Sequence, residues 1–322
     1  MDKDSKNPRG SGNVVTVICL VVLVVCLAGM GVLLYNSHKT KQEYEELKEK
    51  VLSEADEDTE VENIAEPVET EAMDETLTEE AIEEPLEEES GPWYEKYART
   101  PDKEVNFEEL REINPDVYAW ITVDGTAIDY PISHCDEETA FYLDHDINGN
   151  PSKAGMIFTD TCNANDFSDP MTLIYGHNMK NGTMFKGLHS FRDASFFKEH
   201  DTVKIYMDGI ELDYRIYDCF ISQNEHILKT YDFSNSIGYF QYIDSLKNKR
   251  DFSANFRDDS NLEVSDHMLT LITCVGDPAR RLFVQCVLTY PDGTTETDHL
   301  DDATGEEMIG DVIGDYEEPA SE

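Results

Sequence analysis

Short apolar runs separated by turn residues fill the chain between residues 93 and 300. Many of these runs are rich in β-branched and aromatic residues, a composition typical of strands. Asp124-Gly125 and Asp208-Gly209 each stand between two such runs, and Asp-Gly is a strong hairpin signal. The predicted strands cover residues 118–123, 126–130, 155–159, 171–177, 202–207, 212–222, 268–273 and 280–290.

Apolar residues at helical spacing predict a few helices around these strands. Asn106 stands three residues before Glu109, an order that resembles a capping box and predicts a short helix from Phe107. Further helices are predicted over 133–143, over 183–191 with Met184, Phe185 and Leu188 facing inward, and over 236–249 with Ile237, Phe240, Ile243 and Leu246 at helical spacing. The pattern predicts a mostly β protein, a single closed barrel with peripheral helices.

A long apolar segment precedes this domain. Residues 14–35 carry no charge and are numerous enough to cross a bilayer as a helix. A cleavable signal peptide would be shorter and would end in a small-residue cleavage site, which the residues after Tyr35 do not offer. The sequence therefore predicts an uncleaved transmembrane anchor at 14–35, preceded by a polar segment at 1–13.

An acidic segment separates the predicted anchor from the predicted domain. The chain has 69 Asp and Glu against 25 Lys and Arg, a formal net charge of -44, and residues 53–90 are especially acidic. Such a segment cannot bury enough apolar surface to offset its ordering entropy. We therefore predict a disordered acidic linker at 36–92, with at most a brief helix that carries Tyr44, Leu47 and Val51.

Acidic segments flank the predicted domain on both sides, and the acidic composition argues against nucleic acid as a partner. The folded domain is predicted at 93–300, and the acidic residues 301–322 are predicted to be a frayed tail. Nucleic acid is not an expected partner, because its phosphates require a basic surface.

Three residues that suit thiol chemistry stand at strand ends. Cys274 ends one predicted strand, and Arg280 and Arg281 begin the next after a short turn. A thiolate is the reactive nucleophile, and a guanidinium can stabilise it or an oxyanion. His177 ends the predicted strand from Met171 and can exchange protons near neutral pH. A single cysteine is more often a small buried apolar residue, so it is the combination that indicates a catalytic site.

These residues resemble the sortases, cysteine transpeptidases of Gram-positive cell surfaces. Thr270-Leu271-Ile272-Thr273-Cys274 fits the TLxTC signature of that family, Gly176-His177 fits its histidine, and an arginine opens the strand after the cysteine. The resemblance covers roughly residues 93–298 and is specific in its combination of motifs. A predicted helix before the cysteine strand points to class B, as do the segments 114–121, 125–132, 142–146 and 155–160.

The resemblance implies a sortase-like closed barrel with His177, Cys274 and Arg281 as catalytic residues. Cys274 would attack a peptide bond in the sorting signal of a secreted protein, and His177 would protonate the departing amine. The acyl group would then pass to an amine of a peptidoglycan precursor or a pilin-type surface protein. This chemistry requires no metal or organic cofactor. The family also implies a single-pass protein of the cell membrane, with a cytoplasmic N-terminus and an extracellular catalytic domain.

Two assignments within the site depend on strand geometry. Side chains alternate along a strand, so only one of Arg280 and Arg281 can enter the site. We predict Arg281, because it lies opposite the more uniform apolar face of its strand. That face is formed by Leu282, Val284, Cys286 and Leu288. Thr273 is predicted to contact substrate or to orient Arg281, and the alternative is a strand residue with no such role.

The other cysteines and two other functions give alternatives to this interpretation. The cysteines at 135, 162, 219 and 286 show no short C-x-x-C spacing, so no zinc site is predicted. A secreted thiol protease would use the same cysteine and histidine with water as acceptor, and product formation that depends on an amine would distinguish it. A non-catalytic acidic surface protein is the other alternative, and the intact Cys-His-Arg set argues against it.

Overall fold

The structure is a computed structural model that describes residues 41–54, 91–135, 141–251, 253–257 and 262–298, and the single residues 23, 27, 28, 31, 35 and 39. The predicted anchor at 14–35, most of the acidic linker and the tail at 301–322 thus lie largely outside the described residues. Within the described residues, no helix has the length and apolar character needed to span a membrane.

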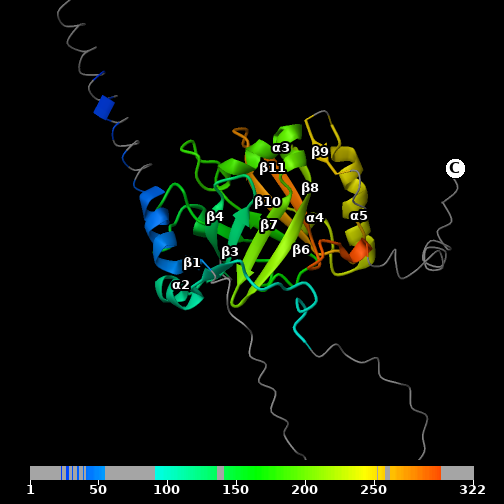
Figure 1. Cartoon of the computed structure of the whole chain (residues 1–322). Helices are drawn as coiled ribbons and strands as arrows, with labels where there is room; N and C mark the ends of the chain where they lie inside the picture. Colours follow the sequence, from blue (N-terminus) through cyan, green and yellow to red (C-terminus); the bar gives the residue numbers. More distant parts are fainter. Residues whose placement is uncertain are drawn as a thin grey trace, which may run out of the picture.

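Eight strands close into a barrel (Figure 1). Neighbouring strands follow the order β11-β10-β6-β5-β4-β3-β7-β8, and β8 also pairs with β11, which confirms the predicted closed barrel. The β6–β10 and β4–β5 pairs are parallel and the others are antiparallel. The strands are β3 (Val117–Val123), β4 (Asp129–Ser133), β5 (Ile157–Thr159), β6 (Met171–Tyr175), β7 (Thr202–Met207), β8 (Ile210–Gln223), β10 (Met268–Cys274) and β11 (Arg280–Leu288).

Short helices surround the barrel, and β9 (Asn255–Phe256) adds to the free side of β8. The predicted cap of α2 is present, since the Asn106 side chain accepts a hydrogen bond from the backbone N–H of Glu109 at 3.0 Å. The segment predicted as a helix at 183–191 forms a 3-10 helix instead. The helices are α2 (Phe107–Ile113), η1 (Phe141–Leu143), η2 (Phe185–Arg192), α3 (Ala194–Glu199), α4 (Ile227–Thr230), α5 (Ser236–Leu246) and η3 (Lys247–Lys249).

β10 and β11 bury both of their faces. Leu271 and Leu282 belong to the cluster inside the barrel, whereas Ile272 and Phe283 belong to a second cluster on its outer face. α5 covers that outer cluster with Tyr239, Tyr242 and Leu246. Only the second half of the apolar spacing noted in the sequence is on the buried side of α5, where Ile243 and Leu246 join the outer cluster. Ile237 and Phe240 are 72% and 60% exposed.

The predicted linker boundaries are wrong at their N-terminal end. Residues 41–51 form a helix against the barrel, next to β1 (Leu52–Glu54), which pairs with β2 (Lys103–Val105) (Figure 1). Tyr44, Leu47 and Val51 are buried in the main core cluster. These residues recur every three to four positions and form an apolar stripe, which the acidic average of the linker conceals. The folded part of the chain thus includes residues 41–54.

Polar contacts also hold this helix in place. The Tyr44 hydroxyl donates a hydrogen bond to the carbonyl oxygen of Gly155 at 3.2 Å. The ammonium of Lys48 lies 3.3 Å from a carboxylate oxygen of Asp129, and both side chains are largely buried. The helix is therefore attached to the start of β4 and to the loop before β5, two neighbouring strands of the barrel.

Candidate active site

Cys274 and Arg281 face each other at the end of the β10–β11 hairpin. They are directly opposite in the antiparallel register. Opposed residues of antiparallel strands project from the same face of the sheet. Ile272 and Phe283, each two residues away from them, pack in the outer cluster, so this face is the outer one. The structure therefore brings together the cysteine and the arginine that the sequence predicts.

His177 follows β6, the parallel neighbour of β10. Tyr175 lies opposite Ile272 in this register, and the backbone N–H of Gly176 donates to the Ile272 carbonyl at 3.2 Å. One residue further, His177 comes to the same end of the sheet as Cys274. Its Nε2 donates to the carbonyl oxygen of Leu143 at 2.7 Å. Because a carbonyl oxygen only accepts, Nδ1 is the basic nitrogen of the neutral ring.

Gly176 allows the end of β6 to pack closely against its neighbours. A Cβ atom at this position would lie 2.5 Å from Cδ1 of Ile157 and 2.7 Å from the ring of Phe185. Phe185 also donates its backbone N–H to the carbonyl oxygen of His177 at 2.9 Å. The Gly-His pair is thus held by η2, which begins at Phe185, as well as by β10.

The backbone of the cysteine is held by two side chains that sequence analysis did not identify. Asn178 Nδ2 and His189 Nε2 donate to the carbonyl oxygen of Cys274 at 2.8 and 3.0 Å. Burial lowers the pKa of His189. The ring is therefore neutral near pH 7, with its one N–H on the carbonyl. Neither residue belongs to a recognisable motif, and only the packing of η2 against β10 brings His189 to the cysteine.

The two arginines make different contacts. Arg281 Nη1 donates to the carbonyl oxygens of Pro278 and Arg280 at 3.1 and 2.9 Å, so its guanidinium folds back over the preceding turn. Arg280 Nη2 donates to the carbonyl oxygen of Ile221 in β8 at 3.4 Å, on the side away from Cys274. The burial of Leu282 inside the barrel and of Phe283 outside it agrees with the predicted alternation.

Thr273 lies on the inner face of β10. Its side chain is buried, and its hydroxyl donates to the carbonyl oxygen of Gly176 at 2.7 Å. This bond joins the ends of β10 and β6, the two strands that carry Cys274 and His177. A role of Thr273 in substrate contact stays a prediction.

The cysteines that the structure describes are all free thiols. Cys219 and Cys286 lie inside the barrel, where burial raises the pKa of both thiols. Buried neutral thiols of this kind pack as small apolar groups, the role expected for Cys286. Cys162 is different, because it is exposed and lies close to Asp160.

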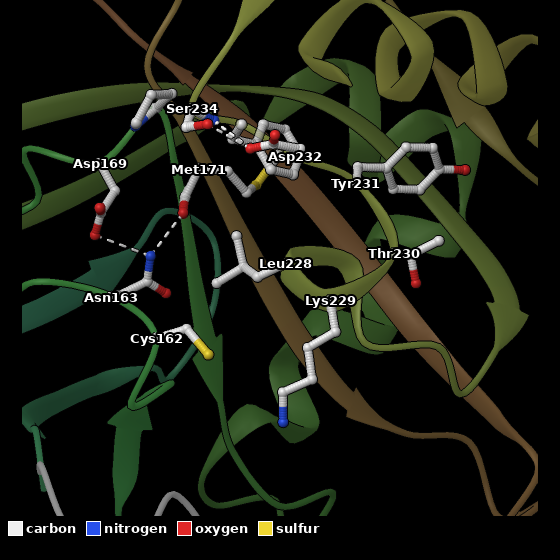
Figure 2. Close-up of a pocket in the computed structure, with 12 residues that line it drawn as sticks. Cys162, Asn163, Asp169, Met171, Leu228, Lys229, Thr230, Tyr231, Asp232 and Ser234 are labelled. Carbon is white, nitrogen blue, oxygen red and sulfur yellow. Dashed lines mark hydrogen bonds between the residues drawn. The ribbon is translucent and has the colours of Figure 1, made fainter.

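A pocket of ≈ 480 Å³ opens between the loop after β5 and the segment that contains α4. Figure 2 shows Cys162, Leu228 and Lys229 around one part of this pocket. Asn163 lies beside Cys162, where its amide donates to the Asp169 carboxylate and the Met171 carbonyl, as the dashed lines in Figure 2 mark. The pocket lies on the outer face, beside the cluster that α4 and α5 cover.

Proteins of one family match this chain. The sortase domain family matches residues 121–289, which include Cys274, His177 and Arg281. Sortase B of Listeria monocytogenes is 30% identical over 166 residues, which cover 52% of this chain and 65% of the Listeria protein. The chain thus matches somewhat less than two thirds of that relative's length.

Solved structures agree with the sequence comparison. Sortase B of Clostridium perfringens superimposes with a TM-score of 0.52 and 32% identity, over 57% of this chain and 99% of that one. A Staphylococcus aureus sortase B–substrate complex superimposes with a TM-score of 0.52 and 26% identity, over 58% of this chain and 85% of that one. The chain therefore belongs to the sortase family and resembles its sortase B members.

Proposed function

We propose that this protein is a cysteine transpeptidase that cleaves a sorting signal and transfers the acyl product to an amine. The observation that carries the proposal is the arrangement at the end of the sheet. Cys274 and Arg281 are opposed on one face, and His177 ends the adjacent parallel strand. A nucleophile, an oxyanion donor and a proton carrier are the three groups that acyl transfer requires.

The first half-reaction forms a thioester. The Cys274 thiolate attacks the carbonyl carbon of the scissile peptide bond, and the Arg281 guanidinium stabilises the resulting oxyanion. The C–N bond breaks as His177 donates a proton to the departing amine. For this role Arg281 must exchange its present contacts with backbone carbonyls for the substrate oxygen. The contact with Pro278 is exposed and the contact with Arg280 is partly buried, so the exchange does not uncover a fully buried charge.

The second half-reaction resolves the thioester. An acceptor amine attacks the thioacyl carbon, His177 takes the proton from the attacking nitrogen, and the Cys274 thiolate leaves. Because the hydrogen bond to Leu143 occupies Nε2, Nδ1 of His177 is the nitrogen that exchanges the proton. Water in place of the amine would give hydrolysis at the same site, which is the protease alternative.

Substrates and acceptors follow from the family. The matched Staphylococcus aureus structure is a sortase B–substrate complex, which supports a substrate site on this fold. We propose sorting-signal-bearing secreted proteins as acyl donors and a peptidoglycan precursor or a pilin-type amine as acceptor. We also propose that residues 14–35 anchor the protein in the cell membrane with the N-terminus inside. The uncharged apolar length of that segment supports the anchor.

One experiment tests the proposal on the full chain. The protein is incubated with a library of sorting-signal peptides, with and without an amine acceptor, and products are identified by mass spectrometry. We expect a thioacyl adduct on Cys274 and an amide product only when the amine is present. Cys274→Ala should abolish both and leave the circular dichroism spectrum unchanged. Turnover by Cys274→Ala would exclude the mechanism, and hydrolysis that added amine leaves unchanged would favour the protease.

A further inference from the structure

We propose that Asp160, Cys162 and His226 form a binding site for a divalent transition-metal cation of the Zn²⁺ type. One ligand atom from each residue lies within 4.8 Å of the other two. Carboxylate oxygen, thiolate sulfur and imidazole nitrogen are the three kinds of ligand that Zn²⁺ takes. A mixed set with sulfur and nitrogen does not suit Ca²⁺ or Mg²⁺, which prefer oxygen.

The fold assembles this cluster from two distant segments. Asp160 and Cys162 lie in the turn after β5, and His226 lies between β8 and α4. The backbone N–H of Asp160 donates to the Leu173 carbonyl at 3.1 Å, which fixes the turn to β6. Because β6, β7 and β8 lie between Cys162 and His226 in the chain, no short ligand motif marks the site in the sequence. This explains why cysteine spacing alone predicted no zinc site.

The carboxylate of Asp160 is already oriented. The residue is 1% exposed, and its Oδ1 accepts the backbone N–H of Cys162 at 3.0 Å. Its Oδ2 accepts the Tyr175 hydroxyl at 3.0 Å and lies 3.0 Å from Nε2 of His226. Metal-binding carboxylates are commonly held by such outer hydrogen bonds. The oxygen that faces His226 can therefore bind a cation without leaving its other partners.

The separation of these two atoms also suits a metal. In a tetrahedral site with bonds of about 2.0–2.1 Å, neighbouring oxygen and nitrogen ligands lie about 3.3 Å apart. Nε2 of His226 and Oδ2 of Asp160 are 3.0 Å apart, so only a small shift is needed to admit the ion. With Sγ of Cys162 as third ligand, a fourth position is left for water or another ligand.

The imidazole of His226 provides an independent observation. Its Nδ1 is buried and has no hydrogen-bond partner in the part of the chain that the structure describes. Buried polar atoms nearly always have a partner, which can be an ion. Either ring nitrogen can bind a metal, so rotation of the ring offers a second way to complete the site.

The pocket gives a cation access to the cluster but also carries a positive charge. Cys162 is exposed and lines the pocket beside the cluster, so a cation can reach its sulfur from solvent (Figure 2). Lys229 lines the same pocket, and its positive charge disfavours a cation there. The thiolate and the carboxylate outweigh it, because both are direct ligands.

The site lies beside the groups of the proposed transpeptidation but does not depend on them. Tyr175, which bonds Asp160, is opposite Ile272, two residues before Cys274. A cation would join the segment after β8 to the turn after β5 across the outer face that carries Cys274. The ion would therefore fix one wall of the active-site face in place.

The test uses the full chain with Cys274→Ala, which removes one of the partly exposed thiols outside the cluster. Zn²⁺ is titrated by calorimetry, and Co²⁺ is titrated by absorption to detect a thiolate-to-metal charge-transfer band. We expect one ion per chain and a charge-transfer band. Introducing Cys162→Ser as well should abolish the band. It should also weaken Zn²⁺ binding by more than about a hundredfold, because loss of an outer hydrogen bond alone can cost up to about that much and Cys162 is a direct ligand. His226→Gln should weaken binding similarly.

Cys135→Ser is the matched control, because Cys135 is another free and partly exposed thiol outside the cluster. It should leave the affinity and the band unchanged. Lys229→Ala should strengthen binding. The proposal is overturned if Zn²⁺ binds the Cys162→Ser protein as tightly as the parent, if Cys135→Ser abolishes the band, or if the parent binds no ion at micromolar concentration. Cys162 is exposed, so its replacement by Ser is not expected to disturb folding.

Discussion

Arg281 and Arg280 are adjacent but are expected to differ greatly in their effect on turnover. Arg281 shares a face with Cys274, whereas Arg280 contacts a carbonyl of β8. Loss of one oxyanion donor typically lowers the rate by about a hundred- to a thousandfold. We expect that loss from Arg281→Ala, and little recovery in Arg281→Lys, because lysine lacks the planar fork.

Arg280→Ala is the matched control for this prediction. Arg280 is half-buried, and its side-chain hydrogen bond to Ile221 is long, so the rate should change by well under about tenfold, within the ~1 kcal/mol typical of charges near the surface. Steady-state turnover of a sorting-signal peptide measures both variants, with circular dichroism as the check on folding. A large loss at Arg280 and a small one at Arg281 would show that the arginine roles are reversed.

His267 gives a prediction about pH. It stacks on Trp93 with ring centroids 4.9 Å apart, and burial, reinforced by the charge of Lys96, lowers the pKa of His267. The unfolded chain binds a proton at this residue more readily than the folded chain does. The contribution of neutral His267 is therefore present above its ordinary pKa of about 6.5 and is lost as pH falls below it.

The pH prediction is tested by comparing the protein with His267→Gln. Urea unfolding at about pH 7.5 and about pH 5.5, either side of the ordinary histidine pKa, gives the free energy of unfolding of each protein. We expect the parent to lose more stability than the variant on acidification. An equal loss would mean that His267 accepts a proton as easily in the fold as in the unfolded chain.

At the scale of elements, the helix over residues 41–51 is a structural part of the domain. Burial of Leu47 against the barrel predicts that Leu47→Ala lowers stability by about 2 kcal/mol, the low end for such changes because the site lies at an edge. For a domain of this size, that corresponds to a fall in Tm of about 4–8 °C. Thermal unfolding of the full chain measures it.

Glu49→Ala is the control on the same helix, since Glu49 is exposed. Its replacement should change Tm only slightly, because exposed helix positions away from special contacts have small effects. If both variants unfold at the parent temperature, the helix does not contribute to the stability of the barrel. A chain cut at Trp93 would remove the helix and β1 together and should be less stable than the full chain.

The end of β6 gives a second prediction at this scale. Gly176→Ala would place a methyl group within 3 Å of Ile157 and Phe185, so either η2 or the Gly-His turn must move. A misplacement of about 1 Å in a catalytic group can lower the rate by about a hundredfold. We expect a loss of that order in turnover, with folding retained, measured on the same peptide as the arginine variants. An unchanged rate would show that η2 can move without shifting His177.

Local signals predicted most of these elements. The Asn106 cap, both Asp-Gly hairpins and the alternation of β11 are properties of neighbouring residues, and the structure contains them all. The buried face of α5 was only partly predictable from its apolar residues, because Ile243 and Leu246 pack on the outer cluster but Ile237 and Phe240 do not. Tyr239 and Tyr242 pack in the outer cluster and Ile237 is exposed, because the packing of the helix on β10 and β11 decides which of its faces is buried.

At the scale of the whole molecule, the sequence predicted a barrel but not the partners of its strands. The pairing of β8 with β11 closes the barrel, and the residues that form it are distant in the chain. The same limit applies to the site. Motifs indicated Cys274 and His177, but the bonds from Asn178 and His189 depend on how η2 packs, which no local pattern encodes.

The parallel pairing of β6 with β10 has a consequence for how fast the site forms. Met171 pairs with Met268, far along the chain, and Trp120 pairs with Tyr206. Chains dominated by such distant pairs refold in about milliseconds to seconds, because long loops must close before the strands interact. Stopped-flow fluorescence of buried Trp120 should show refolding in this range. Activity should return in the same phase, and an earlier return would mean that the site forms without the barrel.

Until that pairing forms, Cys274 of the newly made chain lies apart from His177, its proposed proton donor. Cys274 then has no histidine beside it to protonate a departing amine, and its carbonyl lacks the donors from Asn178 and His189. The thiol of an incomplete chain is thus only an ordinary cysteine. Under the proposed function, transpeptidation can therefore begin only once β10 has joined β6.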